Sequence, residues 1–229
     1  MSESTMNDAV ARGVGVIHTS PATVELFGRL LRERLPGVRV VNLLDDSILG
    51  ELRDNGGDLS AVEPRFRDYA RIVAGRGVAI VLNACSSIGE LCARVETGSG
   101  PAVVRVDARM AEAAVAQGAR IGVLATLRTT LGPTTALIEA TAARLGRAVR
   151  VESGLAESAY EALIGGDQAR HDALVEAALA RSAAENDVVV LAQASMARVA
   201  GRLPADLAEK ILASPGFAVE DVAARLGRA

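Results

Sequence analysis

Aromatic residues are scarce in this chain of 229 residues: they make up 2% of it, and tryptophan is absent. This scarcity argues against the aromatic platforms on which proteins stack single-stranded nucleic acid. The formal net charge of −3 argues likewise against a basic surface for nucleic acid or anionic membranes. Among the 25 basic residues only Lys210 is a lysine. It lies in the helix-like stretch AEKIL, which does not resemble the pocket of a Schiff-base lysine.

Cysteines and long apolar runs are also few. Cys85 and Cys92 are the only cysteines, too few for a disulfide framework or a multi-cysteine zinc site, so we expect no metal. The longest apolar runs, VAIVL and VVVLA, are far shorter than the roughly 20 residues of a membrane span. The first residues lack the basic start and apolar core of a signal peptide. We therefore expect a soluble cytoplasmic protein.

Strand-like and helix-like segments alternate along the chain. Amphipathic stretches over 63–77 and 168–184 predict helices, and Asp167 is a candidate N-cap for the second. One or two more helices are expected in the tail, around 205–212 and 218–227. The strand-like segments are continuous apolar runs, which are typical of buried strands. Their alternation with helix-like segments predicts an α/β fold with parallel sheets. The runs cover 14–17, 38–44, 78–82, 103–106, 120–124, 149–151 and 187–191.

The two halves of the chain share a pattern. In each, a very apolar strand ends in small polar residues: VAIVL is followed by NACSS, and DVVVL by AQAS. We predict two pseudo-symmetric three-layer lobes with mainly parallel sheets and a cleft between them. The first lobe is placed at 1–106, with 200–229 packing back on it, and the second at 107–199. Ligands bind at the carboxyl ends of parallel strands, so the polar residues predict a site.

Four clusters rich in hydroxyl and amide groups follow predicted strands. Such groups, together with backbone N–H groups at helix starts, can bind a carboxylate without bulk. Cys85 lies where a strand becomes a turn or helix, a place that activates a thiolate. We interpret it as functional; the alternative is a small buried hydrophobe, which is our reading of Cys92. The clusters are His18-Thr19-Ser20, Asn83-Ala84-Cys85-Ser86-Ser87, Thr126-Leu127-Arg128-Thr129-Thr130 and Gln193-Ala194-Ser195.

NACSS after a buried strand, LATLRTT near the middle and the second strand-end cluster resemble the aspartate/glutamate racemase superfamily. This superfamily includes amino-acid and hydantoin racemases, maleate isomerases and arylmalonate decarboxylases. The resemblance implies two α/β lobes, no metal or organic cofactor, and a homodimer. It also implies one cysteine from each lobe on opposite faces of a small carboxylate, one removing the α-proton and the other returning it. By this resemblance Cys85 takes the first cysteine's place.

The resemblance also implies which residues contact the substrate. At one position, however, the sequence departs from the family's pattern. Ala192-Gln193-Ala194 stands where the family has Gly-Cys-Thr, and an amide does not exchange a proton at neutral pH. His18 is the best substitute because imidazole titrates near neutrality; the alternative is a capping or structural histidine. Ser195 is a poorer substitute, since no base is evident beside it. The expected substrate contacts are Thr19, Ser20, Asn83, Ser86, Ser87, Thr126, Thr129, Gln193 and Ser195.

Three further polar positions carry weaker signals. Asp45-Asp46, after the second strand, is typical of a solvated turn. His171 lies near the start of a helix beside Asp172, and we expect it to be exposed. Arg128 is a candidate partner for a substrate carboxylate or an ordinary surface arginine.

Three functional hypotheses follow. The leading one is a cofactor-independent racemase or isomerase acting at the α-carbon of a small carboxylate, with Cys85 as acid/base or nucleophile. The second is a one-cysteine decarboxylase or lyase of the same fold, in which Cys85 protonates an enediolate from one face. The third is a non-catalytic protein that binds small carboxylates. Short hydroxyl groups indicate a carboxylate but not its side group, so the substrate stays open.

Overall fold

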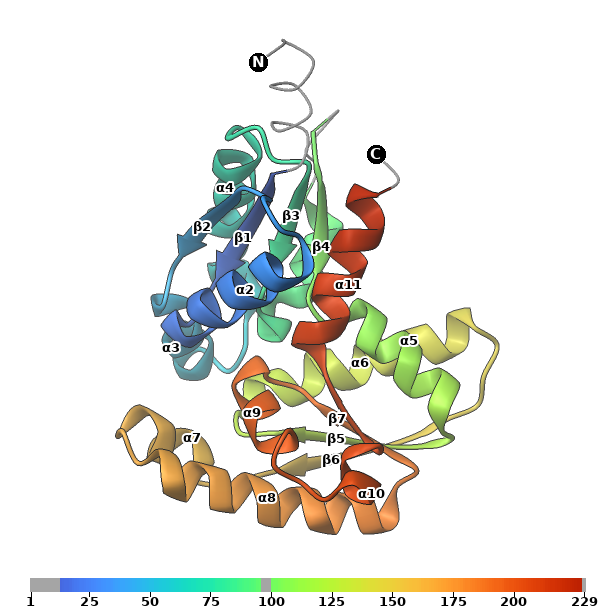
Figure 1. The fold of residues 1–229 in the computed structure, drawn as a ribbon. Coiled ribbons are helices and arrows are strands. Elements are labelled where there is room, and N and C mark those ends of the chain that lie inside the picture. The colour runs from blue at the N-terminus through green and yellow to red at the C-terminus, as the bar shows by residue number, and fades with distance from the viewer. Residues whose placement is uncertain (1–12, 96–99, 228–229) are drawn as a thin grey trace. The chain divides into compact units, whose positions relative to one another are not determined.

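The computed structural model describes residues 13–95 and 100–227 (Figure 1). The amino-terminal stretch in which the sequence shows no signal peptide lies outside these ranges. The chain divides into two compact units: the first comprises the chain up to Val106 and again from Pro215, and the second runs from Asp107 to Ser214. Each unit has a parallel sheet between helices, so the predicted α/β class is confirmed. Within the described ranges, no helix is long and apolar enough to cross a membrane.

The first unit is built on a four-stranded parallel sheet in the order β2-β1-β3-β4. Its strands are β1 (Val14–His18), β2 (Val40–Leu44), β3 (Ile80–Asn83) and β4 (Ala102–Arg105). Its α-helices are α2 (Pro21–Arg34), α3 (Ser47–Asp54), α4 (Glu63–Ala74) and α11 (Ser214–Leu226), and its 3₁₀ helices are η1 (Leu59–Ala61) and η2 (Ser86–Arg94). Pro21 opens α2, where its fixed φ suits the first helical turn.

Both faces of this sheet are covered, which explains why β1 and β3 are apolar throughout. On one face, Phe27 and Leu31 of α2 and Val222 of α11 pack against Val14 and Val16. On the other face, side chains of α3, α4 and η2 pack against Ile17 and Val81 of the sheet; they include Ile48, Phe66, Val73, Ile88 and Leu91.

The second unit repeats this plan with the strand order β6-β5-β7-β8. Its strands are β5 (Arg120–Ala125), β6 (Arg150–Leu155), β7 (Val188–Leu191) and β8 (Ile211–Ala213). Its helices are α5 (Ala108–Gln117), α6 (Arg128–Arg144), α7 (Ala159–Ile164), α8 (Gln168–Glu185), η3 (Ala194–Met196), α9 (Ala197–Ala200) and α10 (Ala205–Ala208). Figure 1 shows α5 and α6 on the opposite side of the sheet from α7 and α8. The predicted cap of α8 is confirmed, since the Asp167 side chain accepts the N–H of Arg170 at 3.0 Å.

The repeat extends to single residues. Val14 pairs with Ile80 in the first sheet, as Ile121 pairs with Val188 in the second. By this register Gly15 and Gly122 are equivalent. A β-carbon at Gly15 would collide with Val73 of α4, and one at Gly122 with Ser182 of α8. In each unit a glycine in the central strand therefore lets a helix approach the sheet closely.

The tail differs from the prediction. Ile211–Ala213 was expected to continue a helix but forms β8, because it pairs in parallel with β7. Residues 200–214 belong to the second unit, whereas the prediction placed them with the first. The rest of the segment predicted to join the first unit, from Pro215 on, does belong to it. The sequence reading also missed α3 and α7, helices of 8 and 6 residues.

Candidate active site

Cys85 and Gln193 occupy the same position in their respective units. The N–H of Ala84 donates to the carbonyl of Ile17 at 2.9 Å, and the N–H of Ala192 donates to that of Leu124 at 2.9 Å. The next residues, Cys85 and Gln193, are both extended and precede η2 and η3 respectively. By the same register, Thr19 after β1 is equivalent to Thr126 after β5.

Polar groups surround the Cys85 thiol. The residue is buried, with 7% of its surface exposed, and it directly precedes η2, which has a kink at Ile88. Burial raises the pKa of the Cys85 thiol above its ordinary value; hydrogen bonds from the Thr19 side chain, from the backbone of Ile88 and from Ser87 offset part of this increase. The sequence predicted an activated thiolate here. Desolvation outweighs these hydrogen bonds, so the resting group is a thiol.

Asn83 holds the turn that carries this thiol. Its Oδ1 accepts the N–H of Cys85 at 3.2 Å, and its Nδ2 donates to the Cys85 carbonyl at 3.0 Å. Nδ2 also lies 3.5 Å from Sγ of Cys92. Asn83 is fully buried, so its amide fixes the backbone of Cys85. This is a different role from the substrate contact that the resemblance implies.

His18 lies on the face of the first sheet opposite to the one against which Cys85 packs. It shares a strand face with Val16, as alternation along β1 requires, and its ring lies 6.4 Å from that of Phe27. Nε2 lies 2.9 Å from Oδ1 of Asn42, and Nδ1 lies 2.8 Å from Oγ1 of Thr23. Burial lowers the pKa of His18, although the Asn42 hydrogen bond opposes the change. Both nitrogens are engaged in a fully buried ring, which fits the structural alternative rather than a proton relay.

Gln193 is held in one orientation by Thr126. Its Oε1 accepts the backbone N–H of Thr126 at 2.6 Å and the Thr126 hydroxyl at 2.9 Å. Because a backbone N–H can only donate, the atom that it meets must be the amide oxygen. The amide nitrogen makes no hydrogen bond to any described residue, so its two N–H groups remain available. An amide in this position can bind an oxygen acceptor but cannot relay a proton.

For the remaining predicted substrate contacts, the structure shows mainly their position and burial. Ser86 and Ser87 are buried beside Cys85 at the start of η2. Ser20 precedes α2, and Ser195 lies within η3. In the second unit, Oγ1 of Thr129 is buried and has no hydrogen-bond partner among the described residues.

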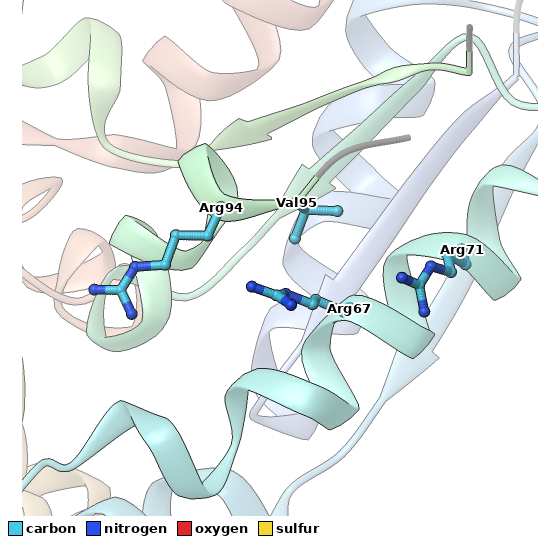
Figure 2. A pocket seen from close by; sticks show the side chains of 4 residues that line it. All are labelled: Arg67, Arg71, Arg94 and Val95. Atoms are coloured by element: carbon cyan, nitrogen blue, oxygen red, sulfur yellow. The ribbon is translucent and has the colours of Figure 1, made fainter. Parts of the chain in front are cut away.

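A cavity of about 280 Å³ opens elsewhere in the first unit, lined by Arg67, Arg71, Arg94 and Val95 (Figure 2). None of the predicted site residues lines it. Among the described residues, no three His, Cys, Asp or Glu side chains gather in a way that could hold a metal ion.

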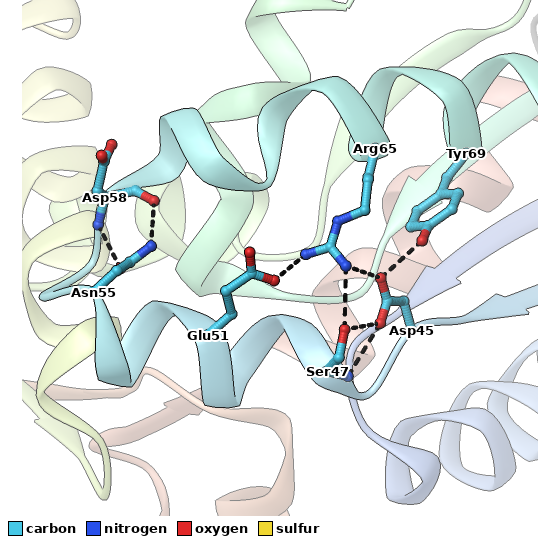
Figure 3. Close-up of polar contacts among 7 residues, drawn as sticks. All are labelled: Asp45, Ser47, Glu51, Asn55, Asp58, Arg65 and Tyr69. Carbon is cyan, nitrogen blue, oxygen red and sulfur yellow. Dashed lines mark hydrogen bonds and ion pairs between the residues drawn. The ribbon is translucent and has the colours of Figure 1, made fainter.

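Asp45 is not a solvated turn residue. Its carboxylate accepts the hydroxyl of Tyr69 at 2.8 Å and both the hydroxyl and the N–H of Ser47, and Arg65 lies beside it (Figure 3). Burial raises the pKa of Asp45, but these hydrogen bonds and the Arg65 charge outweigh it and hold the pKa below its ordinary value. Arg65 also binds Glu51, so the network ties the end of β2 to α3 and α4.

Solved structures similar to this fold include three enzymes. The aspartate racemase of Picrophilus torridus aligns with a TM-score of 0.73 at 12% identity, over 95% of this chain and 95% of that one. The allantoin racemase of Klebsiella pneumoniae gives 0.66 at 18% identity, over 95% and 89%. The chain has the fold of the aspartate/glutamate racemases. A mutant arylmalonate decarboxylase shares this racemase fold, with a TM-score of 0.57 at 19% identity over 94% and 93%. No family model and no curated protein matches the sequence.

The second unit contains one polar cluster that the sequence did not predict. His171 was expected to be exposed but is fully buried, because its Nδ1 lies 2.9 Å from Oδ1 of Asp172. Asp172 on α8 also accepts both terminal nitrogens of Arg198, one at 2.6 Å, and Arg202 at 2.8 Å. Arg198 lies in α9, directly after η3. Asp172 therefore anchors the segment that follows Gln193 and Ser195. The burial of the Asp172 carboxylate is explained by its arginine partners, which are distant in sequence.

Proposed function

We propose that this chain is a cofactor-independent, isomerase-type enzyme that acts at the α-carbon of a small carboxylate and uses Cys85 as its proton-transfer group. One observation carries the proposal: in a racemase fold, the Cys85 thiol lies at a strand end with Thr19, Ser87 and Ile88 hydrogen-bonded to its sulfur. These groups make the position more than a buried apolar cysteine. Cys92, which lies within the same apolar cluster, serves as the internal comparison.

The protonation state of Cys85 suits a proton donor. Since burial raises its pKa, the thiol is protonated at neutral pH and can give its proton to a carbanion or enediolate. The thiolate left behind is then stabilised by the same three neighbours, since hydrogen bonds to a charged group are stronger than those to a neutral one. In an isomerase cycle the thiolate form takes the α-proton, which leaves a carbanion and the thiol, and the thiol then returns the proton to carbon; in a lyase the loss of carbon dioxide supplies the carbanion. A single group can thus act as acid and base in turn.

Gln193 supplies hydrogen-bond donors in this proposal, not a second acid/base. With Oε1 bound to Thr126, the free N–H groups suit a carboxylate or carbonyl oxygen of the substrate. The chemistry therefore runs through one thiol. This departs from the symmetric two-thiol mechanism that the resemblance implies.

A second candidate is a one-cysteine decarboxylase or lyase. The observation that favours it is the same pairing of a resting thiol at Cys85 with a non-titrating amide at Gln193. Loss of carbon dioxide leaves an enediolate that needs one proton from one face, and no second base takes part.

Hydrogen exchange in deuterated water tests the proposal. The purified protein is incubated with aspartate, glutamate, maleate and arylmalonates, and label at the α-carbon, optical rotation and product composition are followed by NMR and polarimetry. We expect label to enter at least one substrate, with altered configuration for an isomerase or with loss of carbon dioxide for a lyase. Cys85→Ser should lower the rate by orders of magnitude, and Cys92→Ser should retain it. If the protein binds a carboxylate but no label enters it and no product forms at any pH tested, the non-catalytic hypothesis is favoured. Full activity in Cys85→Ser would refute the assignment of Cys85 as the proton-transfer group.

A further inference from the structure

The cavity in the first unit has walls that are mainly arginine. Arg67 and Arg71 come from α4, and Arg94 and Val95 from the end of η2. Figure 2 shows the two arginines of α4 facing the end of η2 across the opening. At about 280 Å³, the space is close to the lower end of small-molecule sites. It is larger than one water needs and is lined by cations.

One carboxylate organises two of these arginines. Glu63 precedes Arg67 by one helical turn, and Arg67 donates through Nη2 to its Oε1. Arg94 donates to Oε2 of the same group at 2.9 Å. The Glu63 side chain is 19% exposed, so it is a comparatively buried counterion shared by two guanidinium groups. The two other carboxylates that balance the three arginines, Asp68 and Glu90, are more exposed than Glu63.

The other carboxylates nearby are exposed and replaceable. Arg71 binds Asp68 through Nη1 at 3.1 Å, and both side chains are more than half exposed. Arg94 also binds Glu90. Exposed pairs of this kind contribute little to stability, so a ligand oxyanion can displace them. A guanidinium carries five N–H donors, and Arg67 and Arg71 each use one nitrogen in the contacts of the described residues.

We propose that this cavity binds a small soluble molecule with a multivalent oxyanion, that is, a phosphate or a polycarboxylate group. Arg67 and Arg71 lie four residues apart on one helix face, so a single oxyanion between them offsets the repulsion of their like charges. Guanidinium groups match the paired oxygens of both anion types. The site is distinct from the Cys85 strand end and does not depend on the function proposed for it.

Titration calorimetry at low ionic strength, where screening is weak, tests the site with pyrophosphate, inorganic phosphate and citrate as probes. We expect saturable binding of one probe per chain, weakened about tenfold by Arg67→Ala and by Arg71→Ala, because each removes charge-assisted hydrogen bonds. Asp68→Asn should tighten binding a few-fold, since it removes the exposed competitor of Arg71. Preference for pyrophosphate identifies a phosphorylated ligand, and preference for citrate a polycarboxylate.

Two controls make the result specific. Arg29 on α2 forms a one-turn pair with Glu33, as Arg67 does with Glu63, but it lies away from the cavity lining and both side chains of its pair are exposed, so Arg29→Ala should leave the affinity unchanged. Cys85→Ser should bind the probes as the unaltered protein does. Because Arg71 is well exposed, Arg71→Ala keeps the test valid if Arg67→Ala unfolds. No saturable binding, or equal weakening by Arg29→Ala, would overturn the proposal.

Discussion

Thr126 binds the side-chain oxygen of Gln193 twice, through its backbone N–H at 2.6 Å and its hydroxyl at 2.9 Å. In the first unit the equivalent Thr19 hydrogen-bonds the sulfur of Cys85. The same threonine position thus serves a thiol in one unit and an amide in the other. The second unit thus keeps the threonine that positions the side chain, although that side chain, Gln193, does not titrate.

Thr126→Val should weaken carboxylate binding by misplacing the Gln193 amide. The backbone N–H still binds Oε1, so only the hydroxyl's contribution of about 0.5–1.5 kcal/mol is lost, a reduction in affinity of roughly 2- to 13-fold. The measurement is the Kd of whichever carboxylate exchanges hydrogen in deuterated water. Thr126→Ser retains the hydroxyl and should bind normally; equal loss in both variants would show that packing, not the hydrogen bond, matters.

Gln193→Cys should create or raise racemisation. It places a second titratable thiol at the position equivalent to Cys85, where the Thr126 hydroxyl can stabilise a thiolate as Thr19 does for Cys85. Chiral chromatography of each enantiomer incubated with the variant measures the effect, with Gln193→Ser as the control of similar size. If Gln193→Cys racemises no faster than the unaltered protein, the assignment of Gln193 to the place of a missing second acid/base is contradicted.

Alkylation of Cys85 should be slow at neutral pH and accelerate under alkaline conditions. Only the thiolate reacts, and burial raises the pKa of this thiol. Thr19→Val removes one hydrogen bond to the sulfur and should shift the pH midpoint of alkylation further upward, whereas Thr19→Ser should not. Mass spectrometry of iodoacetamide-treated protein separates Cys85 from Cys92. A midpoint below the ordinary thiol range would show that the helix start outweighs burial.

His18 should stay neutral below the pH at which exposed histidines titrate. Burial lowers its pKa, so the unfolded chain binds a proton before the native state does. The free energy of unfolding should therefore fall as the pH drops below about 6.5. NMR titration of the ring protons reports this directly, and His171→Gln assigns the two histidine signals. A midpoint at or above the ordinary value would instead make His18 available as an acid/base.

The two arginines that bind Asp172 should differ in their contribution to stability. Arg198 binds both carboxylate oxygens and its side chain is 35% exposed, whereas Arg202 binds one oxygen and is 60% exposed. We expect Arg198→Ala to lower the free energy of unfolding by about 1–3 kcal/mol and Arg202→Ala by under about 1 kcal/mol, as measured by urea denaturation. Equal effects would contradict the anchoring role.

Acid should also weaken this cluster. Burial raises the pKa of Asp172, but hydrogen bonds from His171 and Arg198 and the charges of both arginines hold it below its ordinary value. Its contribution is therefore present above about pH 4 and is lost as the pH falls further. In Asp172→Asn the decline of stability in this acid range should be shallower.

The sequence predicts best where local pattern and burial agree. VAIVL followed by NACSS placed Cys85 at the end of β3 correctly, because strands covered on both faces are continuously apolar and the turn residues follow at once. The fold class followed from repeating this pattern. Strand parity could also have placed His18, since it shares a face with Val16 and not with Ile17.

Contacts between distant residues explain the remainder. The segment ending in Ile211–Ala213 has helical spacing, yet pairing with β7 overrides that preference. His171 was read as exposed because its neighbours in sequence are polar, and the partners that permit burial of Asp172 lie in α9 and beyond. The raised pKa of Cys85 depends on how deeply η2 packs, which one-dimensional spacing does not report. Homodimer formation stays a prediction, open to light scattering.

The route of the chain has a consequence during synthesis. The second unit is complete once β8 has left the ribosome, whereas the first still lacks α11, whose Val219 and Val222 fill its core beside Val14. The part of the protein that is translated first is therefore the last to be able to mature, against the usual amino-to-carboxyl order. Cys85 belongs to that part, so the unit that carries it is complete only after α11 has emerged.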